Sequence, residues 1–183
     1  MAINRAETKT YPYTISQSIK ENKPCIFISH QKRDSPECKK IVEYIIKADL
    51  DVYFDEEDEH LADFRRNHNP SGVINSIRHG IDSSTHMLCV ISKNTLASKW
   101  VPFEVGYGYD KTRLAVLTLK GITDTELPDY IKAAPLLLRG TQSVNKYVAS
   151  IKGNSVENLV TEHRLFSHYQ MSHPLDLVLD WDK

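Results

Sequence analysis

Short apolar runs alternate with segments of helical period along most of the chain, and this alternation limits the fold more than any other feature. The runs cover residues 25–29 (CIFIS), 51–54 (DVYF), 87–92 (MLCVIS), 114–119 (LAVLTL) and 136–138 (LLL). Most of these runs are nearly continuous in apolar residues, as strands covered on both faces are. Strands that alternate with amphipathic helices form parallel sheets. We therefore predict an α/β domain with a five-stranded parallel sheet flanked by helices.

Start signals place the helices between these strands. Ser35-Pro36 precedes apolar residues at helical spacing, Pro70 precedes a second such pattern, and a third follows Thr141. The connection over residues 55–72 (DEEDEHLADFRRNHNPSG) has no apolar period. We expect a long loop there, which either is solvated surface or gates a site or contacts a neighbouring molecule.

The length of 183 residues fits one domain with additions at both ends. We expect an N-terminal extension over residues 1–23, the α/β domain over 24–152 and a C-terminal helical extension over 153–183. In the last part Asn154 and Glu157 have the spacing of a capping box. This extra helix is expected to cover the sheet edge or the N-terminal segment. A surface for a partner or for self-association is the alternative.

Composition and missing motifs exclude several classes of function. A net charge of −1 without a basic patch argues against nucleic acid as the main ligand. No apolar leader and no run of about 18 apolar residues is present, so we expect no membrane span and a cytoplasmic protein. Cys25, Cys38 and Cys89 form no CxxC pair and are expected to be reduced core residues.

Cofactor and metal motifs are missing as well. The turn after the first strand has no glycine, which excludes a dinucleotide fingerprint or a P-loop there. The acidic run 55–60 (DEEDEH) lacks the glycine of an EF-hand, and the histidines show no zinc spacing. A glycine-flanked nucleophilic serine is absent too. We expect neither a bound metal nor a cofactor.

Polar residues follow the predicted strands at their carboxyl ends, where parallel sheets bind ligands. Ser29 and His30 follow the first strand, and Asp55 follows the second. Because carboxyl ends of neighbouring parallel strands meet at one edge, these side chains are expected to gather there.

The stretch 98–108 (SKWVPFEVGYG) follows the third strand. Pro102 fits only the first turn of a helix, so a helix should begin near Lys99 or Trp100, with Ser98 available as a cap. Trp100 and Glu104 then leave the helix on one face. From the residues alone two interpretations stay open. Either a core tryptophan stands beside a solvated glutamate that interacts with the helix dipole, or the pair forms two halves of a site.

Four stretches in this order resemble a Toll/interleukin receptor (TIR) domain, in particular the bacterial NAD-consuming kind of Thoeris-type antiphage systems. They are residues 26–35 (IFISHQKRDS), 51–58 (DVYFDEED), 72–92 (GVINSIRHGIDSSTHMLCVIS) and 98–107 (SKWVPFEVGY). The resemblance covers about residues 24–152. It implies a flavodoxin-like fold in which the connection after the second strand is the BB loop of the family.

The resemblance also implies an activity. Glu104 would cleave NAD between nicotinamide and ribose, and NAD would be a substrate rather than a cofactor. The other residues that the family pattern implies for substrate binding are Ser29, His30, Asp55, Ser76 and Trp100, with Lys32, Arg33 and Arg78 as candidates for the pyrophosphate. The implied partners are further TIR domains, by self-association, and an effector protein that responds to an ADP-ribose or cyclic ADP-ribose product.

One carboxylate is enough for this chemistry, because nicotinamide in NAD is already a cationic leaving group and needs no general acid, unlike an ordinary glycoside. The sequence departs from the family pattern at His30-Gln31 and in its acidic BB loop. Two other functions stay open. One is a non-enzymatic interaction scaffold, and the other is a nucleoside deoxyribosyltransferase, which shares a flavodoxin-like sheet.

Overall fold

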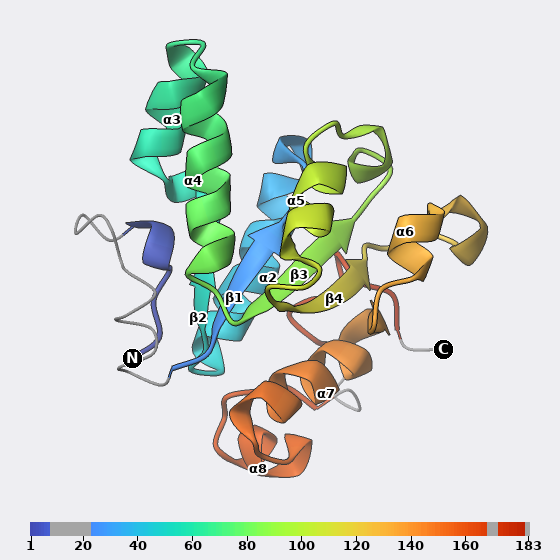
Figure 1. Ribbon diagram of the computed structural model, residues 1–183. Helices are drawn as coiled ribbons and strands as arrows, with labels where there is room; N and C mark the ends of the chain where they lie inside the picture. The colour runs from blue at the N-terminus through green and yellow to red at the C-terminus, as the bar shows by residue number, and fades with distance from the viewer. Residues whose placement is uncertain (8–22, 168–171, 182–183) are drawn as a thin grey trace.

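The predicted five-stranded sheet is present in the computed structural model, which describes residues 1–7, 23–167 and 172–181 (Figure 1). All strands are parallel, in the order β2-β1-β3-β4-β5. The strands are β1 (Cys25–Ser29), β2 (Asp51–Tyr53), β3 (His86–Ile91), β4 (Arg113–Thr118) and β5 (Leu137–Arg139). This is the flavodoxin-like order, in which the switch point lies between β1 and β3. The predicted fold class is confirmed.

Helices cover both faces of the sheet (Figure 1). One face carries α2 (Ser35–Lys47), α7 (Gly140–Lys152) and α8 (Val156–Thr161). The other carries α3 (Glu59–Arg66), α4 (Pro70–Asp82), α5 (Val101–Gly108) and α6 (Asp129–Lys132). Short 3₁₀ turns join these elements: η1 (Arg5–Glu7), η2 (Lys32–Asp34), η3 (Asp55–Glu57), η4 (Thr95–Ala97) and η5 (Asp124–Glu126).

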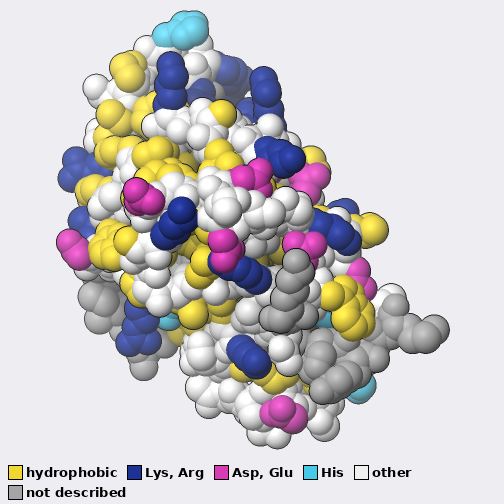
Figure 2. Space-filling view, turned by 90° about the vertical axis from the view of Figure 1, so that its right-hand side faces the viewer, with side chains coloured by type: hydrophobic (Ala, Val, Ile, Leu, Met, Phe, Trp, Pro, Cys, Tyr) yellow, Lys and Arg dark blue, Asp and Glu magenta, His cyan; other side chains and the backbone are white. Residues whose placement is uncertain are grey.

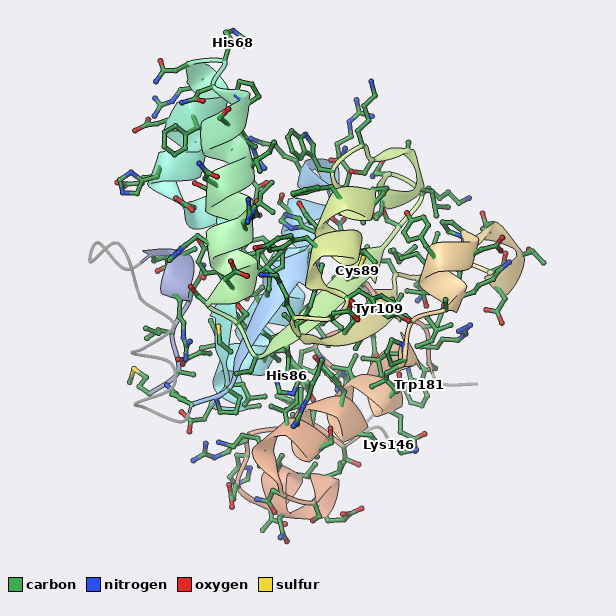
Figure 3. The ribbon with its side chains drawn as sticks, viewed as in Figure 1. His68, His86, Cys89, Tyr109, Lys146 and Trp181 are labelled. Atoms are coloured by element: carbon green, nitrogen blue, oxygen red, sulfur yellow. The ribbon has the colours of Figure 1, made fainter. Side chains whose placement is uncertain are left out.

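The side-chain alternation of the strands divides the core in two. In β1, Ile26 and Ile28 pack with α2 and α7, whereas Cys25 and Phe27 pack with α4 and α5. Every residue of β1 and β3 is buried, as expected for central strands with helices on both sides. The three cysteines are unpaired and buried, and Cys89 lies in β3 beneath α5 (Figure 3).

The connection after β2 is not the loop that the sequence predicted, because it contains helix α3. The Asp58 carboxylate accepts a hydrogen bond from the Leu61 amide at 3.0 Å and caps the helix. Leu61 is buried, and Phe64 packs partly buried against the same core. These two apolar contacts bury the helix against α4 without producing an apolar period that sequence reasoning detects. Together α3 and α4 form a hairpin that projects beyond the sheet (Figure 1).

The C-terminal extension has the predicted extra helix, with two differences. Ser155, not Asn154, caps α8, and the helix ends at Thr161. The extension covers α2 and α7 rather than the sheet edge or the N-terminal segment, since Leu175 and Leu179 are buried in the core of that layer. The Tyr44 hydroxyl donates to Asn145 Oδ1 at 2.6 Å and lies 3.0 Å from His173 Nε2.

The first residues of the chain cover the outer edge of β2. Asn4 forms a parallel bridge with Val52, and the Arg5 guanidinium, 2% exposed, bonds the buried Asp51 carboxylate at 3.0 Å. Covering an edge strand removes its free hydrogen-bonding groups from contact with other chains. Within the described residues, no helix is both long enough and apolar enough to span a bilayer.

Candidate active site

Glu104 is buried in the first turns of α5, and its neighbour Trp100 is exposed. Pro102 occupies the first turn, and the Ser98 hydroxyl accepts from the amides of Trp100 and Val101 at 3.2 Å each. The helix therefore begins about where the sequence predicts. Glu104 is 5% exposed and Trp100 42%. The interpretation of a core tryptophan beside a solvated glutamate is thus wrong, because the two environments are reversed.

Ser29 holds the buried carboxylate. It ends β1, is 1% exposed, and donates a hydrogen bond of 2.6 Å from its hydroxyl to Glu104 Oε2. Burial, followed by the negative charge of Asp55, raises the pKa of Glu104 to about 7. The Ser29 hydrogen bond and the positive charges of His30 and Arg65 act in the opposite direction. The carboxyl group therefore titrates close to neutral pH, the range in which perturbed groups at functional sites work.

His30 follows β1 and lies between acidic groups. Its ring packs on Phe54 at 4.8 Å, with Nδ1 3.7 Å from Asp55 Oδ1 and Nε2 3.7 Å from Glu56 Oε1. Burial disfavours the imidazolium, but the nearby carboxylates outweigh burial and raise the pKa of His30. Burial also raises the pKa of Asp55. His30, Asp55 and Glu56 therefore form a group of interacting charges near Glu104.

Arg65 is a site residue that the sequence analysis missed. Its Nη2 lies 3.3 Å from Asp55 Oδ2, so the guanidinium, together with His30, is a counter-ion of that buried carboxylate. Arg65 comes from α3, which the sequence predicted as loop, and no spacing rule marked it out from Arg66 beside it. Arg66 instead points to solvent and pairs with Asp63.

These side chains surround a cleft of about 210 Å³ at the carboxyl edge of the sheet. Its lining is His30, Gln31, Lys32, Arg65, Ser98, Trp100 and Glu104. Ser29 and Asp55 lie behind this lining, each in contact with one of its members. The structure therefore brings Ser29, His30, Asp55, Trp100 and Glu104 together, as the sequence predicted.

Three residues that were predicted to contact the substrate lie outside the cleft. Ser76 is buried on the core face of α4 beside Ile77, does not line the cleft, and has a hydroxyl without a hydrogen-bond partner among the described residues. The expectation that it faces the pocket is not met. Arg78 packs over the Tyr107 ring at 5.0 Å, away from the cleft. Arg33 is exposed in η2, and of the three candidate cations only Lys32 lines the cleft.

A buried polar cluster fixes the loop that leads from β3 to Trp100. The Asp34 carboxylate, 4% exposed, accepts hydrogen bonds from the Ser92 hydroxyl, the Asn94 amide and the Thr95 hydroxyl. Asp34 lies just before α2, so this cluster ties the β1 and β3 connections together. It holds the start of α5, and with it Glu104, at a set position above the sheet.

A metal-like grouping of three residues also occurs here. One ligand atom each of His30, Asp55 and Glu56 lies within 4.8 Å of the others. Arg65 already compensates Asp55, and an adjacent cation opposes the binding of a second one. We interpret the three residues as an ion-pair network rather than a metal centre.

The strand order and the site together define the class of protein. It is a flavodoxin-like α/β domain that carries a buried carboxylate and an exposed aromatic ring at the switch point of its sheet. The family model described as "TIR domain" matches residues 26–149, and the chain belongs to this family. A comparison with curated proteins found no match.

Proposed function

We propose that this TIR domain cleaves the bond between nicotinamide and ribose in NAD, with Glu104 as the catalytic carboxylate. The observation that carries the proposal is the buried Glu104 carboxylate at a cleft that also contains the exposed ring of Trp100. TIR domains can be NADases, but many act through protein contacts alone. A scaffold gains nothing from a desolvated carboxylate, whose burial lowers the stability of the folded protein at neutral pH.

The chemistry requires one charged group at the reacting carbon. The bond between C1′ of the ribose and the pyridinium nitrogen breaks, and its electron pair neutralises the nitrogen of the departing nicotinamide. Positive charge develops on C1′ and the ring oxygen. An ionised Glu104 beside this carbon stabilises the charge, and more strongly in a dry site than in water. Water, or a nucleophile of the same substrate, then adds to C1′ and releases a proton.

The neighbouring groups of the chain have separate tasks in this scheme. Ser29 orients one oxygen of the carboxylate, leaving the other for the ribose. Trp100 offers its exposed face to the cationic nicotinamide ring, a contact worth on the order of 1 kcal/mol or more. A cationic substrate also favours the ionised form of Glu104, so that substrate binding generates the reactive state.

Self-association and a signalling role are part of the proposal. TIR domains commonly self-associate, and the product, ADP-ribose or a cyclic isomer of it, would signal to an effector protein in antiphage defence. The test is incubation of the purified protein with NAD over a range of protein concentrations, with separation and mass determination of the products. Nicotinamide release with formation of ADP-ribose or an isomer supports the proposal. Unchanged NAD at every concentration contradicts it.

A further inference from the structure

A second cleft adjoins the Glu104 cleft and lies between the α3–α4 hairpin and the start of α5. We call it the hairpin groove. Its volume is about 370 Å³, and it shares Arg65 and Trp100 with the Glu104 cleft. The residues that it adds include Phe64, His68, Asn69 and Val73. Because Arg65 and Trp100 line both clefts, the two clefts are neighbours on the surface.

The size of the Glu104 cleft shows that a dinucleotide must extend out of it. Pockets that enclose drug-sized ligands measure roughly 300 to 1,000 Å³, and this one measures about 210 Å³. It has room for the nicotinamide riboside end of NAD, where the reaction occurs. The remaining phosphates and the second base need another surface, and the hairpin groove begins at the wall of the first cleft.

The lining of the hairpin groove suits a flat, apolar base. Phe64 and Trp100 supply aromatic surface, and Val73 supplies an aliphatic floor. Stacking of a base on an aromatic side chain is worth roughly 1 to 3 kcal/mol. Trp100 is thus placed to contact one base from each cleft.

Arg65 lines both clefts and has hydrogen-bond donors that are not used within the described part of the protein. Its Nη2 bonds Asp55, while no acceptor among the described residues contacts its Nε or Nη1. Its side chain is 36% exposed, so these donors reach solvent. A guanidinium with a free edge binds phosphate oxygens in pairs. The junction is therefore suited to a pyrophosphate.

The charge around the hairpin supports this assignment. Lys32 adds a second cation on the wall of the Glu104 cleft, and His68 lies at the tip of the hairpin (Figure 3). On the face shown in Figure 2, Lys and Arg side chains stand among hydrophobic ones toward the hairpin end, and Asp and Glu side chains lie farther from it. Arg65 and Lys32 are the cations that line the two clefts and can meet a phosphate there.

Asn69 offers a contact that could distinguish one base from another. Its Oδ1 caps α4 by accepting from the Gly72 amide at 2.9 Å, which leaves Nδ2 as a donor without an acceptor among the described residues. Ring nitrogens of a purine are acceptors for such an amide.

We infer that the hairpin groove binds the adenylate half of the dinucleotide, with its base against Phe64 and Trp100 and its pyrophosphate on Arg65. This inference rests on the proposed function and names how the same site recognises its substrate. Arg65 is a positioning and specificity residue in this account, since it contacts the phosphates and not the reacting carbon.

The test compares two substrates in two matched variants. Arg65→Gln removes the phosphate contact, and Arg66→Gln removes a neighbouring charge that faces solvent. The substrates are NAD and nicotinamide riboside, which has the same scissile bond but no phosphate. Loss of Arg65 also alters the charge near Glu104, and nicotinamide riboside reports that effect alone. We therefore expect Arg65→Gln to lower kcat/KM for NAD, chiefly through KM, by about tenfold or more beyond any change in kcat/KM for nicotinamide riboside. Arg66→Gln should change neither.

Two results would overturn the inference. If Arg65→Gln lowers kcat/KM for both substrates equally, Arg65 acts only through Asp55 and Glu104. If it changes neither, the pyrophosphate lies elsewhere. Asn69→Ser, which keeps a capping oxygen but removes the amide donor, is expected to lower kcat/KM for NAD severalfold and to leave nicotinamide riboside unaffected.

A further measurement distinguishes failure of the adenylate site from failure of the proposed NADase activity. If the wild-type protein cleaves neither substrate, the same variants are titrated with ADP in a calorimeter. ADP binding that weakens in Arg65→Gln but not in Arg66→Gln supports the groove as an adenylate site, even though the enzyme assignment has failed. Equal ADP binding by both variants, or none by the wild type at millimolar ADP, overturns it.

Discussion

The Ser29 hydroxyl bonds the Glu104 carboxylate at 2.6 Å, although the two residues are 75 positions apart in the chain. Ser29 stands at the carboxyl end of β1, and Glu104 stands in the first turns of the helix that follows β3. The contact exists because β1 and β3 are neighbours at the switch point of the sheet. It connects the fold to the proposed chemistry.

Replacing Glu104 by glutamine should stabilise the protein at high pH. The pKa of Glu104 is about 7 in the folded protein, against an ordinary value of 4.5. Between these values the folded state keeps a proton that the unfolded chain has lost, so the free energy of unfolding falls as pH rises through this window. Glu104→Gln removes that dependence and keeps an oxygen for Ser29. We expect it to unfold at a free energy roughly 2 to 3 kcal/mol above the wild type at pH 8.

The difference should disappear near pH 4.5, where Glu104 is protonated in the folded wild type. Chemical denaturation at both pH values measures it. Glu43→Gln, at an exposed glutamate of α2, is the control and should show no such pH-dependent gain. A Glu104→Gln variant less stable than the wild type at pH 8 would contradict the burial argument.

Activity should rise with pH, since Glu104 must be ionised to stabilise the developing positive charge. We expect kcat/KM for NAD to increase with an apparent pKa near 7. Ser29→Ala removes a hydrogen bond that favours the carboxylate and should move the apparent pKa of kcat/KM to higher pH. Asp55→Asn removes a nearby negative charge and should move it to lower pH. Shifts in the same direction for both variants would show that another group controls the profile.

Trp100 should contribute to substrate binding and little to folding. It is 42% exposed, so Trp100→Ala loses little buried surface, but it removes the ring proposed to stack on nicotinamide. We expect KM for NAD to rise about tenfold with a nearly unchanged melting temperature. Trp181 is 51% exposed, lies in the C-terminal extension and donates a hydrogen bond to the nearby Asp176 carboxylate. Trp181→Ala is therefore the matched control. Equal kinetic effects of the two variants would show that Trp100 does not contribute to substrate binding.

Much of this fold was predictable from the sequence, because its signals are local. The apolar runs marked the strands, and Pro70 and Pro102 marked helix starts that the structure confirms to within a residue. Glu104, His30 and Asp55 were predicted for the same edge because they follow neighbouring strands. Their convergence needed only the parallel sheet.

The remaining features depend on tertiary contacts. Helix α3 has only Leu61 and Phe64 to bury, so its existence comes from packing on α4 rather than from an apolar period. Arg65 therefore could not be told from Arg66 before the direction of α3 was known. The burial of Glu104 and the exposure of Trp100 also depend on tertiary contacts. The helical period predicts that the two side chains share one face of the helix, but it does not predict how deeply each of them is buried.

Close packing of α3 on α4 requires a glycine at position 72. A Cβ added to Gly72 would lie 2.5 Å from two atoms of the Phe64 ring. Gly72→Ala should therefore lower the free energy of unfolding by roughly 1 to 3 kcal/mol and distort the hairpin groove. Gly106→Ala in α5, where an added Cβ meets nothing within 4 Å, should instead raise it by about 0.5 to 1 kcal/mol. Thermal unfolding of the two variants measures the contrast, and equal effects would contradict it.

The most direct test of the account is the rate of nicotinamide release from NAD by the wild type and by Glu104→Gln, measured side by side at pH 8 and at high protein concentration. The variant keeps the shape of the site and the contact with Ser29 but cannot carry a negative charge. We predict release by the wild type and a rate about a hundredfold or more lower in the variant. Equal release by both proteins would contradict the assignment of Glu104 as the catalytic carboxylate.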